Sequence, residues 1–509
     1  MSATQPPENV TPSGNVAPPE PAPPARTIRA LRHPWTVEVL TEEQLERVHG
    51  ASLRVLERVG LEVRSEGVLR ELGAAGAKID EAKMRAYLPP AMVEECLALI
   101  PPSFLMAARD PALDLPIDGS AGFLSQDGTS AFIVDAETGE RRASNLKDLE
   151  DVTRVVDAVP EVGYLWPGVA PGDVPPHTQA VHITRAMLGN STKHAQHNET
   201  YSRRDARAVL EMVRVVAGGD RALRERPIVS TYQCCISPLV YDEGPIEAAV
   251  EFARGGLPSG FVSMGIPCAT APATLAGALV SMNAEMLGGM AIVEALAPGV
   301  PTFYGPYPTF MDLRTGGYRQ DWGPEDTLLK LSFAQLAHRY RVPINILALD
   351  TGAKTQDWQA GAQHSVSLMA VAVAGRAEMI AATGGLYGAA VYDNVNVILD
   401  AELFDLVCTL LEGMPVAEET IGLEAVAEMC RGGDLLGRPL TAAHVREPWV
   451  PRTFGRETWE AWERAGRPDP RDRAREEVRR ILADHRPEPL PEDVDRELVR
   501  IIEARAAEG

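Results

Sequence analysis

The sequence is poor in cysteine, and the few cysteines present are not arranged as metal ligands or as a disulfide framework. There are six in 509 residues, and none of them is in CxxC spacing. Structural zinc knuckles and the disulfide-dense folds of small secreted proteins are therefore excluded. The first 25 residues lack the apolar core of a signal peptide, so we expect the protein to be cytoplasmic.

Positive charge is also scarce. Lys and Arg number 49 against 71 Asp and Glu, which gives a formal net charge of −22. A nucleic-acid binder needs a basic face to displace counterions from phosphate, and a polybasic membrane anchor needs clustered cations. The longest apolar stretch, 273–298, is interrupted by Asn283, Glu285 and Glu294, so it does not supply the roughly 20 apolar residues of a membrane-spanning helix. We therefore expect neither a nucleic-acid partner nor a membrane partner.

The chain does contain a long alternation of strand-like and helical patterns. Between residues 116 and 411, eight apolar strand-like runs alternate with helical segments at spacings of roughly 30 to 45 residues, which is typical of βαβ units. Eight is the number that closes a (β/α)8 TIM barrel, and this α/β fold is our prediction. A doubly wound open sheet is the alternative, although no GxGxxG motif follows any of the strands.

The two ends of the chain have a different composition. Residues 1–30 are rich in proline and predict a disordered arm, with ordered sequence beginning near Trp35. Residues 35–115 predict an N-terminal helical region whose first helix has a capping box at Thr41 and Gln44. Residues 412–509 predict a C-terminal helical region with a charged tail.

Aromatic residues make up only 6% of the chain, yet several fall where the predicted strands end. They are Trp166, Tyr232, Tyr304, Tyr307, Trp358 and Tyr387. Catalytic and binding residues of TIM barrels gather at the C-terminal ends of the strands. A quaternary ammonium ion has no hydrogen to donate and is held by the faces of aromatic rings together with carboxylates. The aromatic set predicts a substrate-binding cation pocket, although each ring taken singly also fits a packing role.

Other chemistries have less support. Glu285, in the middle of an apolar helix, must find a partner or serve a function, so it is a candidate catalytic carboxylate. His194 and His197 lack the HxH or HxxxH spacing of a zinc pair, and we predict no metal site. Lys193 and Lys354 at strand ends leave open a lyase or aldolase with a Schiff-base lysine. A non-catalytic protein that binds quaternary amines is a further alternative.

An ordered series of short motifs resembles the trimethylamine methyltransferase (MttB-like) family. The series includes SPL at 237–239, NAE at 283–285, GPE at 323–325, AQLA at 334–337 and AK at 353–354. The resemblance covers residues 35–485 and implies a (β/α)8 barrel that moves a methyl group from a methylamine or betaine to the Co(I) of a separate corrinoid protein. The chain has no DxHxxG cobalamin signature, so we expect the corrinoid on a partner protein and none bound permanently. We also expect a homo-oligomer.

The sequence departs from the family's founding type at the pyrrolysine position. In the matching stretch 349–354, Asp350 stands where that type carries pyrrolysine, which makes this chain a non-pyrrolysine member. Without the pyrrolysine imine that captures a neutral amine, trimethylamine is disfavoured as a substrate. A betaine-like quaternary amine is favoured, because its leaving group is already a neutral tertiary amine and the cation needs only to be held in a dry site.

The chemistry of a quaternary ammonium substrate suggests roles for individual side chains. Asp350 is expected to supply a catalytic countercharge to the cation, although a structural hydrogen-bonding role at the strand end is an alternative. Arg314 or Lys354 would receive a substrate carboxylate. An internal ion pair with Asp312 or Asp357 is the alternative reading for these two cations.

Overall fold

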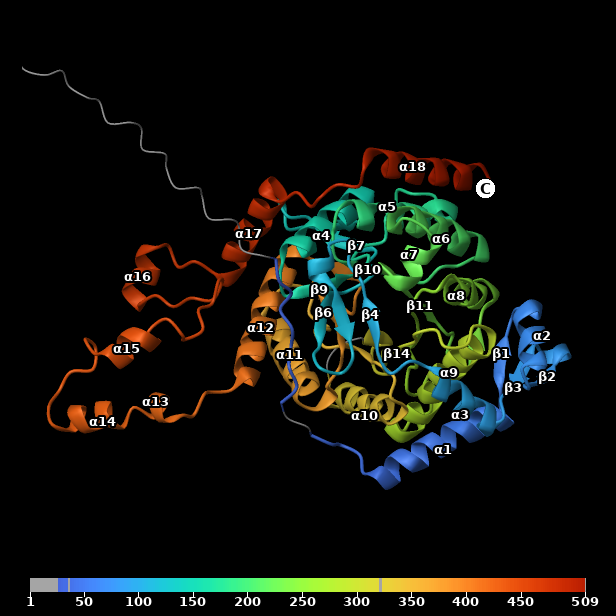
Figure 1. Cartoon of the computed structure of the whole chain (residues 1–509), viewed down its shortest axis with the longest axis horizontal. Helices are drawn as coiled ribbons and strands as arrows, with labels where there is room; N and C mark the ends of the chain where they lie inside the picture. The colour runs from blue at the N-terminus through green and yellow to red at the C-terminus, as the bar shows by residue number, and fades with distance from the viewer. Residues whose placement is uncertain (1–25, 35–36, 320–322, 509) are drawn as a thin grey trace, which may run out of the picture.

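Eight parallel strands form the centre of the protein. The computed structural model describes residues 26–34, 37–319 and 323–508. The strands lie in the order β14-β13-β11-β10-β9-β6-β18-β17, and a bridge between Tyr304 and Ile344 joins the two outer strands. The predicted (β/α)8 barrel is therefore confirmed (Figure 1). Its strands are β6 (Phe123–Gln126), β9 (Val162–Leu165), β10 (His194–His197), β11 (Val229–Cys234), β13 (Ser259–Ser263), β14 (Tyr304–Pro306), β17 (Asn345–Leu347) and β18 (Met379–Thr383).

A helix follows each strand and packs on the outside of the barrel. Strands buried on both faces read as continuous apolar runs, which is why they were recognisable in the sequence. The outer helices are α4 (Leu146–Ala158), α5 (Gln179–Gly189), α6 (Arg203–Ala217), α8 (Glu243–Gly255), α9 (Leu275–Leu296), α10 (Pro324–Tyr340), α11 (Trp358–Ala370) and α12 (Asn394–Glu412). A short α7 (Asp220–Glu225) follows α6.

Helix α9 is apolar on all sides because it is covered on all sides. It packs against β13 and α10 of the barrel and against α1 and α3 of the N-terminal region. In the described part of the chain, α9 alone has the length and apolar composition to cross a membrane, and 78% of that apolar window is buried inside the protein. Its apolar character follows from its position between the barrel and the N-terminal helices.

The N-terminal region contains short strands as well as the predicted helices. The capping box of α1 is present, with Gln44 N–H donating to Thr41 Oγ1 at 3.3 Å and Thr41 N–H donating to Gln44 Oε1 at 2.8 Å. The elements are α1 (Glu42–Arg58), β1 (Leu61–Val63), α2 (Glu66–Ala74), β2 (Lys78–Asp80), β3 (Arg85–Tyr87), α3 (Pro90–Leu99), β4 (Phe104–Met106) and β5 (Leu115–Ile117). Strand β12 (Val240–Tyr241) adds to the edge of the β1–β3–β2 sheet.

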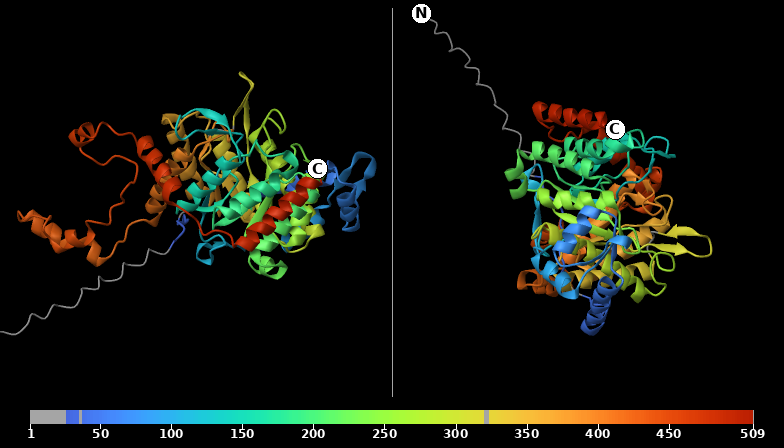
Figure 2. Two further views of the ribbon diagram at one scale, coloured as in Figure 1. Left: turned by 90° about the horizontal axis from the view of Figure 1, so that it is seen from above. Right: turned by 90° about the vertical axis from the view of Figure 1, so that its right-hand side faces the viewer.

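Two small β elements lie at the C-terminal end of the barrel strands. A four-stranded sheet comprises β7 (Phe132–Val134), β8 (Arg141–Ala143), β19 (Gly385–Leu386) and β20 (Val391–Tyr392). A hairpin of β15 (Phe310–Asp312) and β16 (Gly317–Arg319) projects from the body of the protein (Figure 2). Both elements follow barrel strands, so they surround the end of the barrel where the strands terminate.

The segments before and after the barrel differ in how closely they pack against it. Of the predicted disordered arm, residues 1–25 lie outside the described residues, while the backbone of Arg29 and Leu31 hydrogen-bonds to Pro160 and Gly122. The described chain is thus fixed before Trp35. After α12, a projecting segment with no buried side chain in its helices comprises α13 (Glu418–Ile421), α14 (Leu423–Cys430), α15 (Pro439–His444) and α16 (Trp459–Arg464) (Figure 1).

The last two helices return to the barrel wall. Helix α17 (Pro470–Asp484) packs on α12 and α4, and α18 (Glu492–Ala507) packs on α6 and α5. Arg505 Nε lies 2.8 Å from Asp205 Oδ1 of α6, and Arg185 Nε of α5 lies 2.8 Å from Asp495 Oδ1 of α18. The two helices complete the apolar packing over the first half of the barrel.

Candidate functional site

A cavity of about 490 Å³ lies at the C-terminal end of the barrel. Its lining includes the residues that directly follow strands, because the ends of parallel strands converge at one face of the barrel. Asp127 follows β6, Trp166 follows β9, and Tyr307 follows β14, while Tyr232 lies within β11. A larger hollow of about 1010 Å³ lies at the opposite end of the barrel, but it contains no Phe, Trp or Tyr among the described residues that line it.

Three of the predicted aromatic residues meet in this cavity. The ring centroids of Trp166 and Tyr232 lie 5.0 Å apart, and those of Trp166 and Tyr307 lie 6.0 Å apart. The Trp166 indole N–H donates to the side chain of Gln196, which fixes the ring. Gly128 is required beside it, because a Cβ there would lie 2.7 Å from the indole ring. The three rings form a cage whose faces can surround a cation.

Two carboxylates that the sequence analysis did not single out, Asp127 and Glu199, line the same cavity. Burial raises the pKa of Asp127 to about 7, although the N–H of Gly128 donates to its Oδ1 at 2.8 Å. Burial raises the pKa of Glu199 to about 6, and a hydrogen bond with Tyr201 partly offsets this shift. Carboxylates whose pKa is raised in a concave site are candidates for a functional role, because burial of the charged form is costly. Their signal in the sequence was their place directly after β6 and β10.

The charged side chains that line the cavity are all acidic among the described residues. Among the described residues that line it, Asp127 and Glu199 are the acids, and there is no Lys, Arg or His. A cation entering the cavity therefore meets two carboxylates and three aromatic faces. Tyr201 lies at the rim with 68% of its surface exposed, so the cavity is accessible from solvent.

Asp350 is buried near this cavity but does not line it. Its two carboxylate oxygens accept from the ammonium of Lys330 at 2.9 and 2.8 Å. Lys330 is itself buried and lies 2.6 Å from Asp326. The negative charge of Asp350 is thus matched by a fixed lysine, and its effect on the cavity is indirect because it helps to raise the pKa of Asp127.

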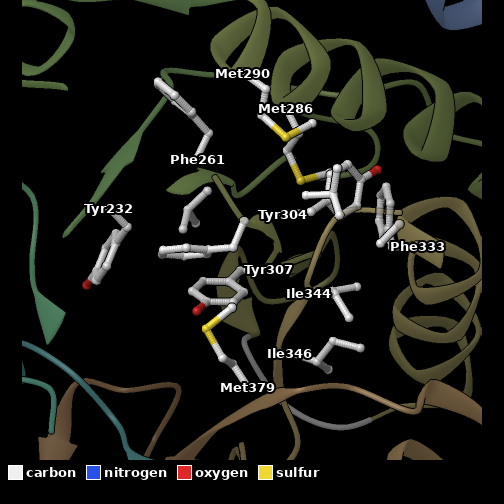
Figure 3. Close-up of a cluster of buried hydrophobic side chains, with 14 of the residues drawn as sticks. Tyr232, Phe261, Met286, Met290, Tyr304, Tyr307, Phe333, Ile344, Ile346 and Met379 are labelled. Carbon is white, nitrogen blue, oxygen red and sulfur yellow. The ribbon is translucent and has the colours of Figure 1, made fainter. Parts of the chain in front are cut away.

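Glu285 and Tyr304 lie on the outer side of the barrel strands. The Glu285 carboxylate accepts from Ser237 Oγ at 2.8 Å and from the N–H of Leu239 at 2.9 Å, and so it holds the loop that follows β11. Tyr304 donates to Asn283 Oδ1 at 2.7 Å and packs beside Phe333, apart from Tyr232 (Figure 3). Neither residue lines the cavity. The partner of Tyr304 lies on α9, and the partners of Glu285 lie in the loop after β11. The hydrogen bonds of the Glu285 carboxylate explain why a glutamate lies within that apolar helix.

The remaining predicted residues are separate from the cage. Arg314 is exposed at the turn of the β15–β16 hairpin, and Trp358 at the start of α11 is 89% exposed. Lys354 and Tyr387 line another pocket, of about 450 Å³. There the Lys354 ammonium lies 4.6 Å from the Tyr387 ring centroid and donates to Gly352 O at 2.7 Å. The structure therefore brings together Trp166, Tyr232 and Tyr307, and none of the predicted cations.

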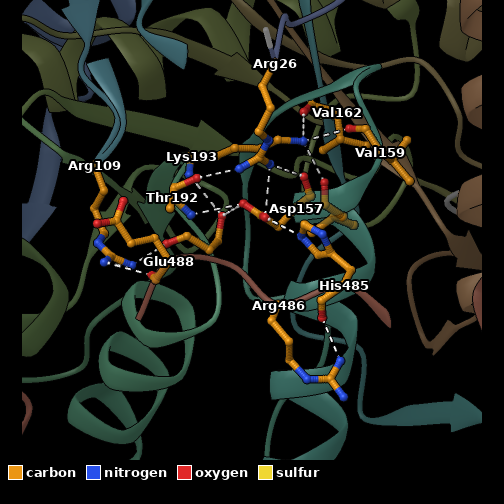
Figure 4. Close-up of polar contacts among 12 residues, drawn as sticks. Arg26, Arg109, Asp157, Val159, Val162, Thr192, Lys193, His485, Arg486 and Glu488 are labelled. Carbon is orange, nitrogen blue, oxygen red and sulfur yellow. Dashed lines mark hydrogen bonds and ion pairs between the residues drawn. The ribbon is translucent and has the colours of Figure 1, made fainter. Parts of the chain in front are cut away.

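Lys193 and Lys354, the candidates for a Schiff-base lysine, do not line the cavity. The ammonium of Lys193 is buried at the start of β10, where it donates to the carbonyls of Val156, Val159 and Val162 at 2.7, 2.7 and 2.5 Å (Figure 4). Burial lowers the pKa of Lys193 to about 7, and Asp157 beside it opposes the shift. Lys193 is fully hydrogen-bonded at the end of the barrel opposite the cage, which gives it a structural role.

The two strand-end histidines are also structural. His194 Nδ1 lies 2.9 Å from Ala107 O and its Nε2 lies 2.9 Å from Ser230 Oγ. His197 Nδ1 lies 2.9 Å from Asn198 O. In the described ranges, no group of three or more His, Cys, Asp and Glu side chains is placed to hold a metal ion.

Comparison with known proteins places the chain in a family. The family model described as trimethylamine methyltransferase (MTTB) matches residues 16–509. Trimethylamine methyltransferase MttB of Desulfitobacterium hafniense (strain DSM 10664 / DCB-2) is 31% identical over 464 residues, covering 91% of this chain and 93% of the relative. MttB of Methanosarcina barkeri is 27% identical, covering 92% and 95%. Glycine betaine methyltransferase of D. hafniense (strain Y51) is 27% identical, covering 92% and 97%.

Among solved structures, the Methanosarcina barkeri monomethylamine methyltransferase (MtmB) covers 88% of both chains with a TM-score of 0.47 and 10% identity. The sequence relatives are nearer and extend over almost the whole of their own length. The chain therefore belongs to the trimethylamine methyltransferase (MTTB) family of methyltransferases.

Proposed function

We propose that this protein transfers a methyl group from a quaternary ammonium compound to the Co(I) of a corrinoid carried by a separate protein. The observation that carries this proposal is the cage of Trp166, Tyr232 and Tyr307 in one cavity with the carboxylates of Asp127 and Glu199. Such a site stabilises a permanent cation, because the attraction of π faces depends on charge. We favour quaternary amines over trimethylamine, because a quaternary amine keeps its charge at every pH whereas trimethylamine also exists as a neutral base.

The side chains present suit a methyl donor that is already activated. When a quaternary ammonium loses a methyl group, the electron pair of the C–N bond stays on nitrogen and the product is a neutral tertiary amine. No proton has to be delivered, so the cage has only to bind the donor, orient one methyl group and exclude water. Asp350, at the position of pyrrolysine in the founding type, is bound to Lys330 and offers no electrophile.

The end of the barrel also suits an acceptor that arrives from outside. When bound, the corrinoid of the partner supplies a strongly nucleophilic reduced cobalt. Tyr201 and Gly388 lie where the cavity reaches solvent, so this is the face at which we place the partner. All six cysteines of the chain are free, and we place the reaction in the cytoplasm.

Methyl transfer to free cob(I)alamin tests this function, with the change in cobalamin absorbance as the readout. We expect transfer from at least one member of a panel of quaternary amines, and slower or no transfer from trimethylamine. Preferred transfer from trimethylamine would contradict the proposal. Binding of quaternary amines without transfer to either free or protein-bound corrinoid would instead make the chain a quaternary-amine-binding protein.

A further inference from the structure

The cavity at the barrel mouth has no place for a negatively charged group. Its two carboxylates among the described residues, Asp127 and Glu199, are accompanied by no Lys, Arg or His. A zwitterionic betaine would carry its own carboxylate into the same enclosed volume of about 490 Å³. Like charges within a few ångströms of each other repel strongly in a site of low dielectric constant.

The cations that could receive a substrate carboxylate are placed elsewhere. Lys330 is buried between Asp326 and Asp350, at 2.6 and 2.8 Å. Lys354 donates to Gly352 O in the neighbouring pocket. Arg314 is exposed at the hairpin turn. None of the three lines the cage, so the bidentate or point-charge recognition that a buried carboxylate requires is lacking there.

The unpaired polar atoms of the cavity point to a hydroxyl instead. Asn198 Oδ1 and Tyr307 Oη are buried and have no hydrogen-bond partner among the described residues, and both residues line the cavity. An amide oxygen can only accept, whereas a phenol can donate or accept. A ligand hydroxyl can donate to Asn198 and accept from Tyr307, while a carboxylate can only accept and would leave Asn198 Oδ1 unpaired.

We propose that the methyl donor is a quaternary ammonium compound with a net positive charge and an uncharged, hydroxyl-bearing tail, rather than a zwitterionic betaine. This inference rests on the proposed function and narrows its substrate class. The rings of the cage receive the trimethylammonium head, and the carboxylates of Asp127 and Glu199 balance its charge. The hydroxyl of the tail carries the hydrogen that Asn198 Oδ1 needs as an acceptor.

Calorimetry at pH 8 with three quaternary ammonium compounds tests the proposal: choline, glycine betaine and tetramethylammonium. We expect choline to bind at least about tenfold more tightly than glycine betaine, a difference of about 1.4 kcal/mol. Tetramethylammonium, which has no tail, reports on the cage alone. Equal or tighter binding of glycine betaine overturns the inference, whereas failure of all three compounds to bind would remove the proposed function as well.

Variants separate charge repulsion from shape. In the double variant Asp127→Asn with Glu199→Gln, the neutral isosteres keep the shape of the cavity, so the preference for choline over glycine betaine should fall to the part that the hydroxyl partners Asn198 and Tyr307 supply. Arg314→Ala is the matched control, and it should leave the preference unchanged because Arg314 lies outside the cage. An undiminished preference in the double variant, or a selective loss of glycine betaine binding in Arg314→Ala, contradicts the proposal. Circular dichroism confirms that each variant is folded.

Discussion

The affinity of the cage for a quaternary ammonium ion should fall as the pH is lowered through 7, because Asp127 then gains a proton. Burial raises the pKa of Asp127 to about 7 and that of Glu199 to about 6. The cation binds tightly only when Asp127 is ionised. With a pKa of about 7, the ionised fraction falls from roughly nine-tenths at pH 8 to roughly one-tenth at pH 6, so Kd should rise about tenfold.

Titration calorimetry with tetramethylammonium at pH 8, 7 and 6 measures this effect, because the ligand itself does not titrate. Asp127→Asn should bind more weakly at pH 8 and show a flatter profile, with only the step due to Glu199 remaining near pH 6. The other charges near Asp127 are paired, Asp350 with Lys330 and His364 with Asp400. A constant Kd in the wild-type protein, or an unchanged slope in the variant, would refute the assignment.

The stability of the same variant provides a readout of opposite sign. The pKa of Asp127 is about 7 in the folded protein against a reference of 3.8, so the folded state holds this proton more tightly than the unfolded state. The stabilisation is present below pH 3.8 and is lost as the pH rises through 7. The ionised carboxylate then costs at most about 4 kcal/mol. Asp127→Asn should therefore have a higher Tm than the wild type at pH 8 and a smaller advantage at pH 5. A lower Tm at pH 8 would contradict this.

Three further outcomes are expected. Trp166→Ala should weaken tetramethylammonium binding by about 1 to 2 kcal/mol through loss of a π face, whereas Trp358→Ala, at an exposed position, should leave calorimetric affinity unchanged. Lys330→Ala removes the buried ammonium that Asp326 and Asp350 share and should lower the free energy of unfolding in urea by about 3 to 5 kcal/mol; a loss under 1 kcal/mol would argue against a buried ion cluster. Glu285→Ala should cost about 3 kcal/mol of stability by unpairing Ser237 and the Leu239 N–H, while the Kd of the folded fraction stays unchanged.

The barrel could be predicted from the sequence because its strands are buried on both faces. A strand such as β18 (Met379–Thr383) has no polar face, so it reads as an apolar run between helices, and eight such runs identify the closed sheet. The N-terminal strands β1 to β5 were missed because each has only three residues. Segments that short have no periodicity to distinguish them from loops.

The site was only partly predictable, because side-chain direction at a strand end depends on the loop. Tyr304 lies within β14 and turns outward to Asn283, whereas Tyr307 lies just past the strand and turns into the cavity. Sequence position alone gave the two residues equal weight. Asp350 looked like a free countercharge because its partner Lys330 lies 20 positions earlier, on α10. The spacing between two residues on different elements carries no information about their contact.

The return of α17 and α18 to the barrel wall has a consequence for how the protein is made. An apolar surface on α4, α5, α6 and α12 is covered by the side chains of Val478, Ile481, Leu498 and Ile501. All eight barrel strands are synthesised before α17 and α18. A nascent chain that already includes β18 therefore still exposes that surface to water. Until α17 and α18 have been synthesised and have packed, the exposed apolar wall is a target for chaperones and for self-association.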